Sequence, residues 1–339
     1  MIENAIKKLT EDTDLTFDET NQVIDEIMTG KTTPIQIASF LTALSVKKET
    51  VEEIAGAAEA MRSHALDFHA DEPVLEIVGT GGDHSNSFNI STTSALIVAA
   101  TGIPVAKHGN RAASSKSGAA DVLESLGVQI DLDPKRSEEI LDQIGICFLF
   151  AQEYHKAMKY VAPVRKELGI RTLFNVLGPL ANPAHASSQV LGVYDEKLVE
   201  PMAKVLSQLG INDAMVIHGQ DGFDEASISA PTTVMEVHNG KFTKYTITPE
   251  EFGLNRAEKA EVIGSTPAEN AQITLDILNG ASGAKRDVIL LNSALAIHTA
   301  RPNIDLHEAI DLARKVIDDG SALNKLNDFI KMTEDGVAA

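Results

Sequence analysis

The sequence has one cysteine, no long apolar run and a shortage of positive charge, and each of these absences excludes a class of protein. The single cysteine, Cys147, excludes an internal disulfide, and the apolar run GICFLFA around it predicts a buried, unreactive thiol. No stretch approaches the roughly 18 consecutive apolar residues of a membrane span. The opening residues MIENAIKKLTEDTD lack the apolar core and cleavage site of a signal peptide, so we expect a cytoplasmic protein.

The charge balance disfavours polyanionic partners. The 339 residues include 29 Lys and Arg against 49 Asp and Glu, which gives a formal net charge of −20. Such an acidic chain is repelled by nucleic acid over an extended surface. We therefore expect no nucleic-acid and no membrane partner. A small anion can still bind in a pocket where backbone amides, a few cations or a metal ion outweigh the overall field.

The length suits two linked domains, and the apolar fraction of 43% is that of a globular protein. Residues 1–70 predict helices alone. Thr16 to Glu19 and Thr50 to Glu53 are capping boxes, and Thr33-Pro34 supplies a cap and a first-turn proline. We expect these residues to form a small all-helical domain, and helices from about 165–190 are candidates to complete it.

From about residue 71 the pattern becomes that of a larger α/β domain, which we expect to extend over residues 71–339. Short apolar runs, VLEIV, IPVAK and DAMVIH, alternate with longer helical stretches such as STTSALIVAATG. This alternation predicts a mostly parallel central sheet with helices packed on it. Polar and apolar residues alternate on both sides of Asn239-Gly240, which predicts a hairpin with a type I′ turn. The last third is helical again, and Thr266 caps a helix that has Pro267 in its first turn.

A glycine-rich loop follows the first predicted strand, in VLEIVGTGGDHSNSFNIST (residues 74–92). Glycines let the backbone approach a ligand and turn amide N–H groups toward an anion, and the helix that begins at Asn89 adds its own free N–H groups. The loop is not a P-loop, because no Gly-Lys-Ser/Thr follows. It is not a dinucleotide fingerprint, because His84 stands where the third glycine should be. An ordinary strand-to-helix turn is the alternative.

Cations and hydroxyls crowd into a second loop, AKHGNRAASSKSGAADVLE (residues 106–124). Such a cluster suits a phosphate or pyrophosphate, and a solvated polar loop is the alternative. Its place after a strand favours a site, since loops at the carboxyl ends of neighbouring strands line one crevice. A third loop, HGQDGFDEASIS (residues 218–229), carries the adjacent acids Asp224 and Glu225, which suit either Mg²⁺ or a solvated surface.

Taken in chain order, GTGGD, NxST, KHGNRAxSSxSGxADVLE, VRKELGIRTLFNVLGPLANP and DGFDE resemble the anthranilate phosphoribosyltransferase family, over essentially the whole chain. The resemblance implies transfer of the phosphoribosyl group of 5-phosphoribosyl-1-pyrophosphate (PRPP) to the amine of anthranilate. This reaction releases pyrophosphate and belongs to tryptophan biosynthesis. The implied fold is a nucleoside-phosphorylase-like α/β domain, which binds PRPP and carries catalysis, joined to a helical domain through which two subunits pair as a homodimer.

The resemblance implies catalysis by electrostatics and positioning, without a certain acid, base or nucleophile. The residues implied to hold PRPP lie in the first two loops and are Gly79, Gly82, Asp83, Ser87, Asn89, Ile90, Ser91, Thr92, Lys107, His108, Gly109, Asn110, Arg111, Ala112, Ala113, Ser114, Ser115 and Ala119. Ser91, Asp224 and Glu225 are implied to bind two Mg²⁺ per subunit.

Anthranilate is implied to meet Asn110 and Arg165, with Gly79 shared between the two substrates and with His108 and His155 as further contacts. The chemistry of these residues agrees independently. The amine of anthranilate is aromatic and neutral at pH 7, so it needs placement more than a strong base. The guanidinium of Arg165 suits its carboxylate. On the PRPP side, metal ions on pyrophosphate oxygens stabilise the departing negative charge.

Two other functions stay open from the sequence. A pyrimidine nucleoside phosphorylase shares the implied fold, but it would bind orthophosphate and need no acid pair, so DGFDE together with KHGNR disfavours it. A non-catalytic paralogue that binds nucleic acid should have a basic surface and a lost acid pair, and the sequence has neither feature.

Overall fold

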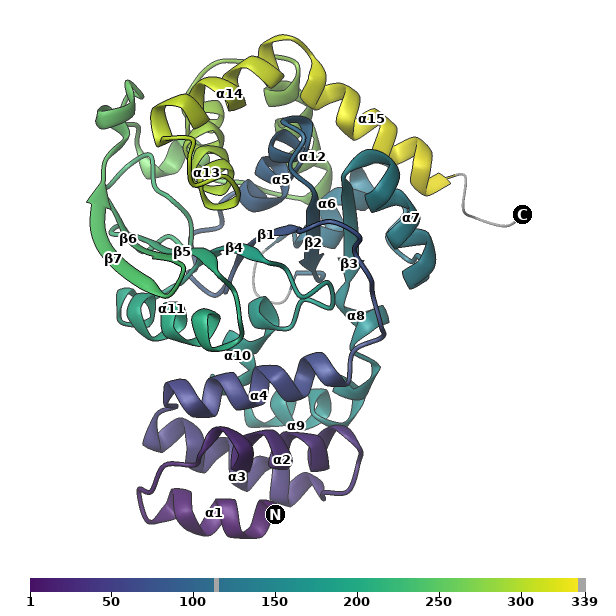
Figure 1. The fold of residues 1–339 in the computed structure, drawn as a ribbon, viewed down its shortest axis with the longest axis vertical. Coiled ribbons are helices and arrows are strands. Elements are labelled where there is room, and N and C mark those ends of the chain that lie inside the picture. Colours follow the sequence, from purple (N-terminus) through teal and green to yellow (C-terminus); the bar gives the residue numbers. More distant parts are fainter. Residues whose placement is uncertain (113–115, 335–339) are drawn as a thin grey trace.

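The structure, a computed structural model, describes residues 1–112 and 116–334 and divides into a helical part and a larger part built around a sheet (Figure 1). The helices that open the chain are α1 (Ile2–Thr10), α2 (Phe17–Met28), α3 (Pro34–Lys47) and α4 (Val51–Ser63). The caps predicted at Thr16, Thr33 and Thr50 are confirmed, because each hydroxyl accepts the N–H of the third helical residue at 3.2–3.3 Å.

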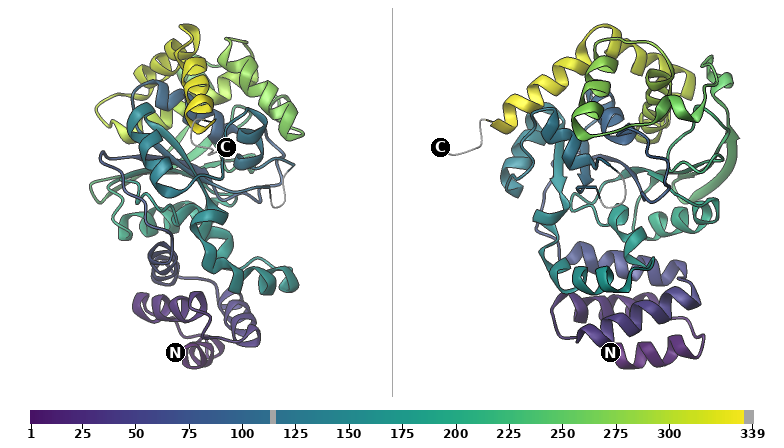
Figure 2. Two further views of the ribbon diagram at one scale, coloured as in Figure 1. Left: turned by 90° about the vertical axis from the view of Figure 1, so that its right-hand side faces the viewer. Right: turned by 180° about the vertical axis from the view of Figure 1, so that it is seen from behind.

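Two later segments pack against these helices. α9 (Ala162–Leu168) contacts α3, and α10 (Phe174–Leu177) contacts α4. Val161, Val164 and Phe174 share one buried apolar cluster with α1 to α4. Figure 2 shows this segment, in teal, beside the purple N-terminal helices. Residues far apart in the sequence therefore build the helical part together.

A single sheet joins the strands of the described residues, in the order β3-β2-β1-β4-β5-β6-β7. Their bounds are β1 (Leu75–Gly79), β2 (Val105–Gly109), β3 (Ile146–Phe150), β4 (Ser188–Gly192), β5 (Asp213–Gly219), β6 (Thr232–His238) and β7 (Lys241–Ile247). Neighbours from β3 to β5 are parallel, and β6 and β7 are antiparallel, so the predicted mostly parallel sheet is confirmed. The predicted burial of Cys147, on β3, is also confirmed.

The predicted hairpin turn is confirmed as well. β6 and β7 meet at Asn239 and Gly240, whose φ angles of 48° and 75° are both positive, as a type I′ turn requires. Short 3₁₀ turns complete the elements between the strands and helices, at Lys156–Tyr160, Gly178–Leu180, Glu196–Leu198, Pro249–Phe252 and Lys259–Val262.

Helices cover both faces of the sheet (Figure 1). Most of them lie on the face away from the helical part, and they are α5 (Ile90–Ala100), α6 (Ala119–Ser125), α12 (Pro267–Leu278), α13 (Ala284–Ala300), α14 (Leu306–Asp318) and α15 (Ser321–Glu334). α7 (Pro134–Ile144) packs beside β3 and α15, α8 (Ala151–Tyr154) follows β3, and α11 (Val199–Gln208) covers the face toward the helical part.

Alternation along β5 separates two apolar cores. Met215 and Ile217 belong to the core with α5 and α13, whereas Ala214 and Val216 belong to the core with α11 and the helical part. Across residues 1–112 and 116–334, no helix has both the length and the apolar character needed to cross a bilayer.

The carboxyl ends of β2 and β3 point toward the helical part (Figure 1), and their parallel neighbours end at the same edge of the sheet. The three loops singled out in the sequence follow strands at this edge.

Candidate active site

The glycine-rich loop leaves the end of β1 and bends through left-handed backbone. Gly81 and Gly82 have φ angles of +67° and +74°, which glycine adopts without strain. Gly79, the last residue of β1, has another reason to lack a side chain: a Cβ there would lie 2.4 Å from Oδ2 of Asp224. The first loop therefore lies directly against the third loop, and a larger residue at position 79 would displace the acid.

The start of α5 ties the first loop to the second. Asn89 precedes the helix, as predicted, and its side-chain amide donates to the carbonyl of Ser117 at 3.2 Å. The hydroxyl of Ser117 donates back to Oδ1 of Asn89 at 3.0 Å. Asn270, on α12, donates to the same Oδ1 at 3.0 Å. Because Asn89 is held in this way, Ile90, Ser91 and Thr92 form the first turn of α5 beside the second loop.

The acid pair of the third loop packs into the first loop. The N–H of Gly81 donates to Oδ2 of Asp224 at 2.6 Å, and Asp224 is buried. Burial, reinforced by the nearby carboxylate of Asp83, raises the pKa of Asp224 to about 7. Burial, together with the charge of Asp224, raises the pKa of Glu225 well above its usual value. Oδ2 of Asp83 is buried without a hydrogen-bond partner in the described residues. Three carboxylates thus crowd one place.

Lys107 brings the second loop to the same place. Its side chain is buried, and Nζ donates to the carbonyl of Ile77 at 2.7 Å and lies 3.5 Å from Oγ of Ser91. Its charge acts on Glu225, which lowers the pKa of that acid against the effect of burial. Ser91, Asp83, Asp224, Glu225 and Lys107, which come from three loops, therefore meet in one cluster.

Two buried polar residues that the sequence did not single out lie beside Lys107 and His108. Glu76, on β1, is fully buried and accepts the backbone N–H of His108 at 3.0 Å. Asn182 donates its side-chain amide both to Glu76 and to the carbonyl of Ala106, the latter at 2.8 Å. β1 and β2 are paired as backbone neighbours only at Leu75 and Val105. Beyond that point, these side chains take the place of the backbone hydrogen bonds that would otherwise join the two strands.

The gap between β1 and β2 is therefore filled by buried polar groups. Burial raises the pKa of Glu76 and lowers that of Lys107. The opposite charges partly offset these shifts, because Lys107 lowers the pKa of Glu76 and Glu76 raises the pKa of Lys107. Glu76 thus supports both the charge of Lys107 and the position of His108. A signal for Glu76 was present in the sequence, because it is a charged residue inside the apolar strand VLEIV. Asn182 lies in the motif VRKELGIRTLFNVLGPLANP, but it was not singled out within it.

Two histidines lie together beside the second loop. The rings of His108 and His155 are 5.1 Å apart and meet edge to face. Both are buried, and Nε2 of each lacks a partner in the described residues. Burial lowers the pKa of His155 to about 4, and burial together with His155 lowers the pKa of His108 well below its usual value. Both rings are therefore neutral at pH 7.

Other predicted residues are not drawn into the cluster. The side chain of Arg111 is exposed and pairs with Asp121 and Glu124. Asn110 accepts from Gln152 at 3.2 Å. Arg165, on α9, stacks over the ring of Phe174 at 5.5 Å, and no hydrogen bond or ion pair joins it to the three loops as far as the structure describes them.

The remaining predicted residues lie along the same loops. Gly82, Asp83 and Ser87 follow β1, Gly109 ends β2, Ala112 follows it, and Ala119 begins α6. Three predicted residues, Ala113, Ser114 and Ser115, lie outside the described residues.

Two family models match the chain. The glycosyl transferase family, helical bundle domain, matches residues 3–65, and the glycosyl transferase family, a/b domain, matches residues 71–323. A relative from Lacticaseibacillus casei, named anthranilate phosphoribosyltransferase, is 58% identical over 98% of each chain.

Solved structures are similar over nearly the whole chain. Anthranilate phosphoribosyltransferase from Thermus thermophilus has a TM-score of 0.93 and 42% identity, over 97% of this chain and 99% of that one. The enzyme of the same name from Saccharomyces cerevisiae, in complex with PRPP and Mg, has a TM-score of 0.90 and 31% identity, over 98% of each chain. In complex with 4-fluoroanthranilate, the yeast enzyme has a TM-score of 0.90 and 29% identity, also over 98% of each chain.

Proposed function

Because the chain belongs to the anthranilate phosphoribosyltransferases of the glycosyl transferase family, we propose that it transfers the phosphoribosyl group of PRPP to the amine of anthranilate in tryptophan biosynthesis. The observation that carries the proposal is the cluster of Asp224, Glu225 and Asp83 against Lys107 and the glycine-rich loop. In a chain with net charge −20, this cluster supports a site where a small anion binds together with its counter-ions.

PRPP is proposed to lie over the first two loops. The N–H groups of the glycine-rich loop and of the first turn of α5 would donate to pyrophosphate oxygens. Lys107 would supply a positive charge from below, because its Nζ lies 3.5 Å from Ser91 at the start of that helix. The second loop, from Gly109 onward with Ala119 at the start of α6, would continue the site along the ribose and its phosphate.

The acid cluster fits Mg²⁺. Within the part of the chain that the structure describes, no three His, Cys, Asp or Glu side chains are grouped as a complete metal site. Mg²⁺ does not require one, because it is commonly held by one or two carboxylates, phosphate oxygens of the substrate and water. The raised pKa of Asp224 and the buried Oδ2 of Asp83 support a cation at this place, since a positive charge would relieve the crowding of the carboxylates. We propose that Asp224, Glu225 and Ser91 hold two Mg²⁺ per subunit, which would neutralise charge on the departing pyrophosphate.

Anthranilate is proposed to lie on the side of the helical part. The guanidinium of Arg165 would bind its carboxylate, and Asn110 would be a polar neighbour. The neutral rings of His108 and His155 suit an aromatic substrate, since uncharged rings can pack against its apolar face. The amine would then face the ribose carbon, and its placement there, rather than a base, would assist the transfer.

Replacing Arg165 by alanine is expected to raise the KM for anthranilate about ten-fold or more, the scale of one charge-assisted hydrogen bond. Binding of PRPP with Mg²⁺, measured by calorimetry, should stay unchanged, because no hydrogen bond or ion pair joins Arg165, on α9, to the described residues of the phosphate loops. Lys166→Ala, on the same helix but exposed, is the matched control. Equal damage to both substrates would instead make Arg165 a structural residue or a phosphate ligand.

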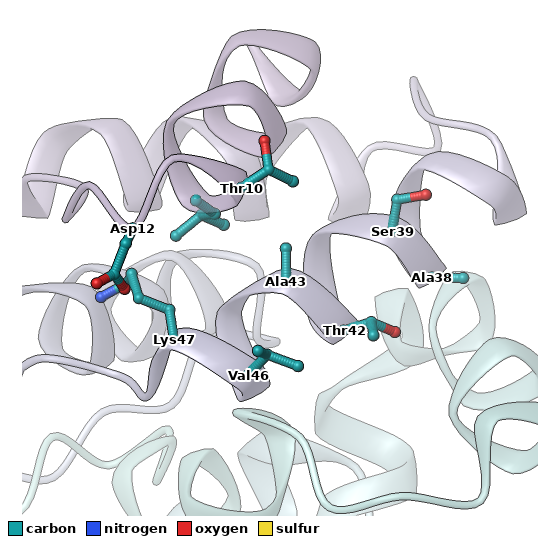
Figure 3. Close-up of a pocket in the computed structure, with 9 residues that line it drawn as sticks. Thr10, Asp12, Ala38, Ser39, Thr42, Ala43, Val46 and Lys47 are labelled. Carbon is teal, nitrogen blue, oxygen red and sulfur yellow. The ribbon is translucent and has the colours of Figure 1, made fainter.

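We also propose a cytoplasmic homodimer, with the helical part as the contact surface. Ile35 and Val46, on α3, are 79% and 77% exposed, which is unusual for large apolar side chains. Beside them α1 and α3 form a groove of about 670 Å³, whose lining includes Leu9, Ala38 and Ala43 (Figure 3). A second copy of the chain would bury this surface. Analytical ultracentrifugation tests the proposal, and the mass of a single chain at micromolar concentration would contradict it.

The activity itself is tested by fluorescence. Anthranilate is fluorescent, and its signal should fall only when enzyme, PRPP and Mg²⁺ are all present. Thymidine or uridine with orthophosphate should give no reaction. Phosphorolysis of either nucleoside, without consumption of anthranilate, would show a pyrimidine nucleoside phosphorylase instead.

A further inference from the structure

Arg171 connects three segments that are distant in the sequence. Its Nη2 donates to the carbonyl of Gly82, in the glycine-rich loop, at 2.6 Å. Its guanidinium lies over the ring of Tyr194, 4.0 Å from the centroid, just beyond β4. Its own carbonyl accepts the hydroxyl of Ser45, on α3, at 3.0 Å. The helical part, the end of β4 and the glycine-rich loop therefore meet at one residue.

The loop is tied to the same segment a second time. The N–H of Thr80 donates to the carbonyl of Gly192 at 2.9 Å, and the N–H of Tyr194 donates to Oγ1 of Thr80 at 3.2 Å. Tyr194 thus holds the beginning of the loop through its backbone and, through its ring, supports the arginine that holds Gly82. The space beside Gly82 is correspondingly tight, because a Cβ there would lie 3.3 Å from Nη2 of Arg171.

The choice of partner indicates a specific role. The chain contains 49 acidic residues, and Arg111 and Arg286 pair with carboxylates, yet Arg171 pairs with none among the described residues. An exposed guanidinium ordinarily stays hydrated or forms an ion pair. Here it is oriented by an aromatic face and donates to a main-chain carbonyl. That carbonyl immediately precedes Asp83, one of the three crowded acids.

We propose that Arg171 is a positioning residue for PRPP, which fixes the glycine-rich loop through the carbonyl of Gly82 and links that loop to the helical part. The inference rests on the proposed function, because it assumes that the loop receives the pyrophosphate. Arg171 lies shortly after α9, which carries Arg165. The segment that contains the proposed anthranilate-binding residue therefore also contacts the glycine-rich loop. Loss of the Arg171 side chain would leave the amides of the loop less well ordered before PRPP binds.

The test uses the full-length protein with Arg171→Ala, Arg171→Lys, Tyr194→Leu and Tyr194→Phe. Arg171→Ala is expected to raise the KM for PRPP about ten-fold or more, the scale of one hydrogen bond from a charged donor. The KM for anthranilate at saturating PRPP and the thermal midpoint should stay near those of the wild type. Arg171→Lys should restore part of the loss, because it can donate to Gly82 but cannot stack. Arg314→Ala, an exposed arginine on α14, is the matched control and should change nothing.

The tyrosine variants show whether Arg171 acts through the loop. Tyr194→Phe keeps the ring and should resemble the wild type, whereas Tyr194→Leu should raise the KM for PRPP. Arg171→Ala combined with Tyr194→Leu should be no worse than Arg171→Ala alone, because the ring acts only through the guanidinium. A wild-type KM for PRPP in Arg171→Ala, an additive double variant, or an equal rise in both KM values with a lowered thermal midpoint would overturn the proposal.

Failure of the proposed function would be visible separately. In that case the wild-type protein would show no turnover with PRPP and anthranilate. Calorimetric binding of Mg²⁺ with inorganic pyrophosphate would still compare the wild-type loop with that of Arg171→Ala. Weaker binding by the variant would support the positioning role, and equal binding would contradict it.

Discussion

Replacing the acid pair, with Asp224→Asn and Glu225→Gln together, is expected to lower kcat at least ~100-fold, the scale lost with one strong transition-state contact. Both carboxylates lie in the crowded cluster against the glycine-rich loop, and the amide replacements keep their shape but remove the charge that would hold Mg²⁺. Initial rates of anthranilate consumption at saturating PRPP and Mg²⁺ measure the effect. Wild-type turnover that persists in EDTA would contradict the metal requirement.

The same double variant should be more stable than the wild type when no metal is present. The raised pKa of Asp224 means that its charged form is disfavoured in the folded protein at pH 8, by burial first and by Asp83 second. Removing both charges should raise the free energy of unfolding in EDTA by about 1 kcal/mol. Asp71→Asn with Glu72→Gln, an adjacent and exposed acid pair before β1, is the control and should change neither activity nor stability appreciably. A variant that is both inactive and less stable would point to a folding defect instead of a lost metal site.

Lys107→Met is expected to lower kcat/KM for PRPP at least ~100-fold, because it removes the buried cation beneath the proposed pyrophosphate site. Methionine is one atom shorter than lysine and keeps most of its apolar stem, so the change removes the charge and the hydrogen bond to Ile77 with little loss of packing. Stability should fall by about 3 kcal/mol, because Glu76 and Glu225 lose their counter-charge inside the protein. Chemical denaturation measures this loss. Lys204→Met, an exposed lysine on α11 paired with Glu200, is the control.

Combining Lys107→Met with Glu76→Gln separates the two effects. The second change removes the buried carboxylate that the first leaves unpaired. The free energy of unfolding of the double variant should therefore be about 1–3 kcal/mol higher than the sum of the single changes predicts. Activity should not return, because the cation at the site is still missing. Recovery of activity with stability would mean that Lys107 serves only the fold.

Local signals in the sequence predicted much of this fold. The three threonine caps, the turn at Asn239-Gly240 and the α/β alternation each follow from chemistry within a few residues, so neighbours in the chain suffice to predict them. β3 and β4 were not identified as strands. β4, SQVLG, offers few β-branched residues, and it is a strand because it pairs with β1 and β5 on both sides.

The site divides in the same way. The three loops could be singled out because glycines, cations and acids are unusual after apolar strands. The contacts between these loops could not be predicted from the sequence, because the approach of Gly79 to Asp224 joins residues more than a hundred positions apart. Asn182 and Arg171 lie in the motif VRKELGIRTLFNVLGPLANP, but nothing within that motif distinguishes them from their neighbours. Their contacts are with another strand or loop and could not be predicted from the sequence.

We expect the chain to couple the breaking of PRPP to the use of anthranilate. This coupling is tested most directly by measuring, in one reaction with Mg²⁺, the pyrophosphate released and the anthranilate consumed. The two amounts should be equal throughout the time course, and no pyrophosphate should be released when anthranilate is omitted. Pyrophosphate released without anthranilate consumption, or consumption of anthranilate without PRPP, would contradict it.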